Sequence, residues 1–211
     1  MTSPATTLTR PAAFLDRDGT LVEERNFLGD PAVADLLPGV IDAIRVLNKW
    51  GFWVIGVSNQ SGVARGYYGS ADVEAVNEKI MNDLASNHAY LNRIYHCPHH
   101  PAVQRQRGLP PCACRKPAPG MIERAISDYP IDLTQSFMVG DQLADVRLGK
   151  AVGIPAILVR TGFGEHEHSH LDAGDTPDAV VPDLLAAVRW IGLTRGLPLD
   201  GANGQAPGPV D

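Results

Sequence analysis

Short, nearly continuous apolar runs recur along the chain and are separated by longer segments of mixed polarity. Four of them, at residues 12–15, 52–57, 136–140 and 156–159, are too short for helices and lie next to glycine or polar turn residues. This pattern predicts buried strands, and a weaker run at 91–95 is assigned as a further strand. Strands without polar alternation are typical of a parallel sheet that is covered on both faces.

Helical periodicity fills the intervals between these runs. Apolar residues return every three or four positions in five segments, which are residues 39–50, 70–86, 119–128, 143–151 and 184–191. Strands that alternate with helices predict an α/β fold with a doubly wound parallel sheet. Residues 21–37 lack this periodicity, so we expect a loop there that reaches over one sheet edge. No insertion is long enough to form a cap domain.

Length and composition indicate one globular domain. With 211 residues, 44% hydrophobic and 20% charged, we expect a disordered leader at 1–10, a single domain at 11–195 and a disordered Gly/Pro/Ala-rich tail at 196–211. A formal net charge of -6 argues against a nucleic-acid-binding protein. The first ten residues show no secretory signal, and no run of about 18 apolar residues could span a membrane. A cytoplasmic protein is therefore expected.

Two carboxylates follow the first predicted strand. Asp16 and Asp18 are two positions apart, so their side chains would share one face of an extended chain, and Gly19 lets the backbone turn there. Ligands bind at the carboxyl ends of the strands in open α/β sheets, and carboxylate oxygens suit a hard divalent cation such as magnesium. The alternative is a simple polar turn, because Asp and Gly favour turns for local reasons.

Other strand ends supply the remaining groups that phosphoryl transfer requires. Ser58 and Asn59 follow the second strand, Asp141 follows the strand at 136–140, and Lys116 precedes a helix. A metal and a lysine can neutralise phosphate oxygens, while a hydroxyl donates to them. One aspartate then remains as a nucleophile, and a second can move the proton of the leaving group. For Asp145 a supporting carboxylate and a helix N-terminal acid remain equal alternatives.

All three cysteines lie in one proline-rich loop, at residues 97–114. Cys97, Cys112 and Cys114, together with His99 or His100, provide three thiolates and one imidazole, which suffice for a closed tetrahedral zinc site. The odd number of cysteines argues against a disulfide framework. Zinc would hold a loop that cannot bury enough apolar surface itself, whereas the alternative is a surface loop with reduced thiols.

Taken in order, Asp-Arg-Asp-Gly-Thr at 16–20, Ser58-Asn59, Lys116 and the Gly-Asp-x-x-x-Asp at 140–145 resemble the four-part signature of haloacid-dehalogenase-like phosphatases. The resemblance implies a Rossmann-like fold and an aspartyl-phosphate intermediate. It implies that Asp16 is the nucleophile and that Asp18 is the general acid/base. Asp16, the backbone carbonyl of Asp18, and Asp141 would bind magnesium, while Ser58 and Lys116 would hold the phosphoryl group.

The cysteine loop resembles one branch, the heptose-bisphosphate phosphatases and their histidinol-phosphate phosphatase relatives. This resemblance selects His99 over His100 as the zinc ligand, next to Cys97, Cys112 and Cys114. The segment 58–67 is closer to the heptose enzymes, which implies removal of the 7-phosphate of a heptose 1,7-bisphosphate. Arg115 would recognise the second phosphate through its guanidinium. The other expected substrate-binding residues are Glu24, Arg25, Asn26, Phe27, Asn59, Gln60 and Ser61.

Two alternatives to this function stay open. One is a histidinol-phosphate phosphatase or a phosphatase of broad sugar-phosphate specificity, and the other is a zinc-stabilised binding protein on a phosphatase fold. The resemblance suggests a monomer that acts on a small phosphorylated sugar. The His-rich segment 165–170 is predicted to be a solvated loop rather than a metal site.

Overall fold

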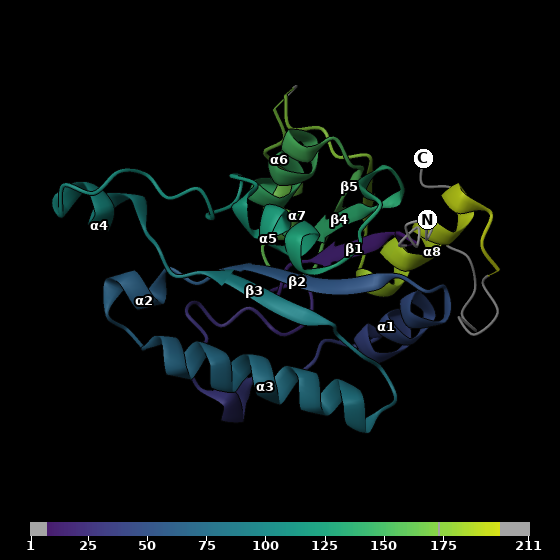
Figure 1. The fold of residues 1–211 in the computed structure, drawn as a ribbon, viewed down its shortest axis with the longest axis horizontal. Helices are drawn as coiled ribbons and strands as arrows, with labels where there is room; N and C mark the ends of the chain where they lie inside the picture. The colour runs from purple at the N-terminus through teal and green to yellow at the C-terminus, as the bar shows by residue number, and fades with distance from the viewer. Residues whose placement is uncertain (1–7, 173, 199–211) are drawn as a thin grey trace, which may run out of the picture.

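The computed structural model describes residues 8–172 and 174–198, and its centre is a parallel sheet (Figure 1). Six strands pair in the order β3-β2-β1-β4-β5-β6 among these residues, and every pair is parallel. The strands are β1 (Ala12–Leu15), β2 (Trp53–Asn59), β3 (Arg93–Cys97), β4 (Phe137–Gly140), β5 (Ala156–Val159) and β6 (Ala179–Val181). The predicted parallel α/β sheet is confirmed.

Helices cover both faces of this sheet, as the apolar strands predicted. In β1, Ala13 and Leu15 pack into the layer that holds α1 (Val40–Lys49), α3 (Ser70–Ser86) and α8 (Leu184–Arg195). Ala12 and Phe14 face the opposite layer, which holds α5 (Gly120–Asp128) and α6 (Leu143–Val152). All four β1 residues are completely buried, because alternate side chains of one strand enter two different cores.

Short elements account for most differences from the predicted pattern. The segment at 165–170, predicted as a loop, instead forms α7 (Gly164–His168), and this prediction was wrong. A five-residue helix is too short for a 3.6-residue period to be detected. The same applies to α2 (Gly62–Arg65) and α4 (Pro101–Gln106), and to the 3-10 turns η1 (Pro31–Val33) and η2 (Leu133–Gln135). β3 begins two residues later than predicted and includes Cys97.

The ends of the described chain pack against the domain. The backbone N–H of Arg10 donates to the carbonyl of Pro130, and its guanidinium carbon lies 3.7 Å from the centre of the Trp53 ring. Trp50 Nε1 donates to the carbonyl of Pro198, so ordered contacts continue past position 195. The remaining parts of the predicted leader and tail, 1–7 and 199–211, lie outside the described residues. No described helix has the length and apolar character needed to cross a membrane.

The strand order places one sheet edge at a topological switch point. The chain runs outward from β1 through β2 to β3, and then returns to the other side of β1 for β4, β5 and β6. The connections after β1 and β4 therefore diverge, which opens a crevice at their carboxyl ends. In the described residues no cap domain covers it, and the loop predicted at 21–37 folds back through the paired residues Asp18–Val22 and Val22–Leu36. The cysteine loop with α4 extends away from the sheet (Figure 1).

Candidate active site

A buried lysine bridges two aspartates at the carboxyl edge of the sheet. Asp16 follows β1, and its backbone N–H donates to the Val139 carbonyl of β4 at 2.9 Å. Lys116 Nζ lies 2.8 Å from Asp16 Oδ1 and 2.7 Å from Asp145 Oδ1. Burial alone would lower the pKa of Lys116, but Asp145 and Asp16 outweigh it and raise that pKa above its usual range. The ammonium therefore remains charged between two carboxylates.

Asp141, at the end of β4, is completely buried and only partly hydrogen bonded. Its Oδ2 accepts from the Phe163 backbone N–H at 2.8 Å, whereas its Oδ1 has no donor among the described residues. Gly19 and Gly162 have positive φ angles of 78° and 56°, and a Cβ at either would collide with this carboxylate. Burial, with added repulsion from Asp16, raises the pKa of Asp141 to about 9.

These carboxylates fit a hard divalent cation. Oxygens of Asp16, Asp141 and Asp145 all lie within 4.8 Å of one another. Burial first, and the neighbouring carboxylates second, raise the pKa of Asp16 to about 7 although Lys116 opposes the shift. Lys116 pairs with only two of these three buried carboxylates, and one oxygen of Asp141 has no donor among the described residues. Magnesium would supply the missing positive charge at oxygen ligands, so the residues fit this ion.

Asp18 lies beside this cluster, but its carboxylate contacts Arg17 and Gln60 instead of the other aspartates. It accepts from the Arg17 guanidinium and from Gln60 Nε2, so the two aspartate side chains do not converge as strand alternation suggested. Gly19 turns the chain immediately after Asp18 and ends the extended conformation on which that expectation depended. Ser58 Oγ is 3.4 Å from Asp18 Oδ2, so the expected hydroxyl lies beside the Asp18 carboxylate.

A cavity of about 230 Å³ opens above these groups. Eleven of the expected catalytic and substrate-binding residues line it, namely Asp16, Asp18, Glu24, Asn26, Phe27, Ser58, Asn59, Gln60, Ser61, Arg115 and Lys116. Arg25 does not line it, because its guanidinium pairs with Glu23 at 2.6 Å and Asp35 at 3.5 Å. Both amide atoms of Asn59 bond to the Lys116 backbone, so this side chain fixes the lysine.

Four further residues line the cavity, which are Leu28, Tyr68, Gln142 and Phe163. Tyr68 and Phe163 stand in loops whose fold the local sequence pattern does not determine. Asp145 is both a helix N-terminal acid and a supporting carboxylate. Its Oδ2 accepts from the Gln142 backbone N–H at the start of α6, while its Oδ1 faces Lys116. No sequence signal distinguishes the two uses of one carboxylate.

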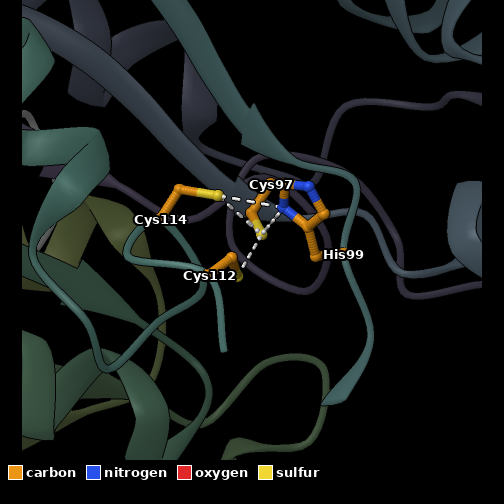
Figure 2. A group of neighbouring side chains, drawn as sticks. All are labelled: Cys97, His99, Cys112 and Cys114. Carbon is orange, nitrogen blue, oxygen red and sulfur yellow. Dashed lines mark hydrogen bonds between the residues drawn. The ribbon is translucent and has the colours of Figure 1, made fainter. Parts of the chain in front are cut away.

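The cysteine loop brings together the four expected zinc ligands (Figure 2). The sulfur atoms and His99 Nδ1 all lie within 4.8 Å, with separations of 3.1 Å for Cys97–Cys114, 3.7 Å for Cys97–Cys112 and 3.3 Å for His99–Cys114. Tetrahedral zinc with Zn–S near 2.3 Å separates sulfurs by about 3.8 Å. Burial and the adjacent Cys114 thiol raise the pKa of Cys97 above its usual range. The donor set and the Cys97–Cys112 separation suit zinc, whereas Cys97 and Cys114 lie closer together than zinc ligation requires.

Comparison with known proteins places this site in a family. Residues 113–187 match the family model described as HAD-hydrolase-like. D-glycero-beta-D-manno-heptose-1,7-bisphosphate 7-phosphatase of Escherichia coli K12 is 42% identical over 153 residues, which cover 72% of this chain and 80% of the relative. D-glycero-D-manno-heptose-1,7-bisphosphate 7-phosphatase of Thermosynechococcus vestitus is 40% identical over 191 residues, covering 86% and 95%.

A solved structure agrees with the sequence relatives. The D,D-heptose 1,7-bisphosphate phosphatase of B. bronchiseptica, complexed with magnesium and phosphate, superposes with a TM-score of 0.77 and 31% identity, and the match covers 88% of this chain and 99% of that one. Relatives above 30% identity are thus matched over most of their length, and the expected resemblance is confirmed. The chain belongs to the D-glycero-D-manno-heptose-1,7-bisphosphate 7-phosphatase family of haloacid-dehalogenase-like hydrolases.

Proposed function

We propose that this protein hydrolyses the 7-phosphate of D-glycero-D-manno-heptose 1,7-bisphosphate and releases heptose 1-phosphate and inorganic phosphate. The observation that carries the proposal is the buried group of Asp16, Lys116, Asp141 and Asp145 at the base of an open cavity. The carboxylates can bind a divalent cation. This cation and the lysine together offset the negative charge of a phosphoryl group. The sugar is inferred from the family relatives, which are heptose-1,7-bisphosphate 7-phosphatases.

In this proposal Asp16 attacks phosphorus, and the bond between phosphorus and the sugar oxygen breaks. That oxygen takes a proton from Asp18, which leaves an aspartyl-phosphate. Asp18 then takes a proton from water as the water oxygen bonds phosphorus, and Asp16 is released. Ser58 and Lys116 hold phosphoryl oxygens. Asp16, Asp141 and the backbone carbonyl of Asp18 would hold magnesium, which would supply positive charge that offsets the phosphoryl oxygens.

Unpaired cations near the cavity support a substrate with a second phosphate. Arg115 lines the cavity, and its Nη1 donates to the His99 carbonyl. Arg65 lies beside the cavity, because its guanidinium carbon is 5.5 Å from the centre of the Phe27 ring, and its Nη2 is 2.7 Å from His100 Nε2. No carboxylate of the described residues forms an ion pair with either guanidinium, although the chain carries a net charge of -6. A second phosphate can occupy these donors.

Replacing Arg115 with methionine is expected to reduce kcat/KM for the heptose bisphosphate by about 100-fold, since a charge-assisted bond to a phosphate contributes about 1.5–3 kcal/mol. Turnover of p-nitrophenyl phosphate, which has no second phosphate, should change less than about 3-fold by the same reasoning. Arg105→Met is the control, because Arg105 does not line this cavity. Equal losses on both substrates would contradict the assignment of Arg115.

A substrate panel tests the sugar itself. We expect phosphate release with magnesium from one anomer of heptose 1,7-bisphosphate to exceed release from histidinol phosphate and fructose 1,6-bisphosphate by about 100-fold in kcat/KM. Comparable rates on all of them would indicate a phosphatase of broad specificity, and a preference for histidinol phosphate would reassign the substrate. No activity on any of them would favour a zinc-stabilised binding protein.

The cofactor and cellular assignments belong to the same proposal. Cys97, His99, Cys112 and Cys114 hold a structural zinc ion that leaves no open position for catalysis. The three cysteines form no disulfide, and unpaired thiols suit a reducing compartment, which supports a cytoplasmic location. The family resemblance also supports a monomer.

A further inference from the structure

The carboxylate of Asp18 is held from one side by a buried arginine. Arg17 Nε donates to Asp18 Oδ2 at 3.1 Å, and Nη2 donates to Oδ1 at 3.0 Å, so both oxygens are engaged. The Arg17 side chain is completely buried. It also donates to Asn77 Oδ1 of α3 and to the Leu28 carbonyl. A two-pronged contact from such an anchored guanidinium fixes the plane of the carboxylate.

A glutamine holds the same carboxylate from the other side. Gln60 Nε2 donates to Asp18 Oδ2 at 2.6 Å and to Ser58 Oγ at 2.8 Å. Gln60 Oε1 accepts from the Tyr68 hydroxyl at 2.8 Å. A reversed amide would place Oε1 against the carboxylate and its N–H groups against Tyr68. The carboxylate only accepts hydrogen bonds, so it requires the Nε2 end of the amide, and the Tyr68 hydroxyl holds the Oε1 end in place.

Two glycines leave the space that the Tyr68 ring occupies. A Cβ at Gly29 would come within 2.5 Å of the Tyr68 ring, and one at Gly62 would collide with the same ring. Gly29 belongs to the loop that follows β1, whereas Gly62 begins α2. The tyrosine thus packs between two segments that both line the cavity, which leaves its ring little freedom to move.

We propose that Arg17, Gln60 and Tyr68 are positioning residues that hold the Asp18 carboxylate in the orientation needed for proton transfer to the leaving oxygen. This rests on the proposed role of Asp18. The Asp18 side chain is 15% exposed and lines the cavity, so it is accessible to substrate although it is held on both sides. Proton transfer requires this orientation because donor and acceptor must meet within hydrogen-bonding distance.

The test uses leaving groups with different needs for a proton. A sugar alkoxide must be protonated as it leaves, whereas p-nitrophenolate leaves without a proton. We expect Tyr68→Phe to lower kcat/KM for heptose bisphosphate by about 10-fold and for p-nitrophenyl phosphate by less than about 2-fold, within the range of general acid catalysis. Gln60→Met should show a larger difference of the same kind. Asp18→Asn provides the full effect for comparison.

Tyr67→Phe is the matched control, because it makes the same change one residue away. The Tyr67 ring packs against Phe27, with centroids 4.8 Å apart, and its hydroxyl is outside the network around Asp18. If Asp18→Asn discriminates between the two leaving groups but Tyr68→Phe and Gln60→Met do not, the positioning role is overturned while the proposed function stands. If Asp18→Asn itself does not discriminate, the proposed role of Asp18 fails and the positioning role fails with it.

Discussion

Asp16→Asn is expected to lower kcat by about 10⁴-fold or more, because an amide cannot attack phosphorus and no aspartyl-phosphate forms. The change is nearly isosteric, and Lys116 keeps its contact with Asp145. Loss of turnover should therefore come from chemistry rather than from unfolding. Phosphate release from heptose bisphosphate measures the rate, and mass spectrometry of the quenched wild-type enzyme detects a phosphorylated peptide that contains Asp16.

A second measurement on the same variant separates chemistry from stability. Burial, together with the negative charges of Asp145 and Asp18, raises the pKa of Asp16 to about 7, although Lys116 opposes this shift. The ionised form of Asp16 is therefore unfavourable in the folded protein. Removing that charge should leave the unfolding temperature of the metal-free protein unchanged or raised. Asp42→Asn, at an exposed carboxylate on α1, controls for the substitution itself. Substantial phosphate release by pure Asp16→Asn would contradict the covalent mechanism.

Patterns with a strong periodic signal predicted the fold well. The bounds of β1, α3 and β5 agree with the sequence expectations residue for residue, because each element has a buried apolar face along its full length. β6 lies at the sheet edge and has only three partly buried residues, so its apolar run is too short to indicate a strand. Elements shorter than two helical turns, such as α7, are determined by tertiary contacts rather than by local periodicity.

The candidate site was predictable in its residue types but not in its contacts. Residues at the ends of neighbouring parallel strands must meet, which explains why Asp16, Ser58 and Asp141 gather at one edge. Side-chain direction after a glycine turn does not follow from alternation, so the contacts of Asp18 were not predictable. Arg25 shows the same limit, because exposed acidic neighbours draw its guanidinium away from the cavity.

Cys112→Ser is expected to remove the zinc ion and to lower kcat/KM by about 10- to 100-fold, a range typical when metal-site support is lost. Loss of the metal should affect the site because Arg115 and Lys116 directly follow the zinc ligand Cys114 in the chain. Asn59 and the carboxylates still hold Lys116, so the core should stay folded. Arg115, whose Nη1 donates to the His99 carbonyl, should lose its position, and activity on the bisphosphate should fall most.

Metal analysis and limited proteolysis measure this effect. The wild-type chain should contain one zinc ion and resist cleavage in 97–116, whereas Cys112→Ser should contain none and be cut there, because zinc binding and the folding of the loop are coupled. His100→Ala is the control, since His100 lies outside the four-ligand cluster and its loss should leave the zinc content unchanged. Magnesium removal should abolish activity reversibly without exposing the loop. Full activity and protease resistance in zinc-free protein would contradict a structural zinc and leave the four side chains as a thiol cluster without a metal.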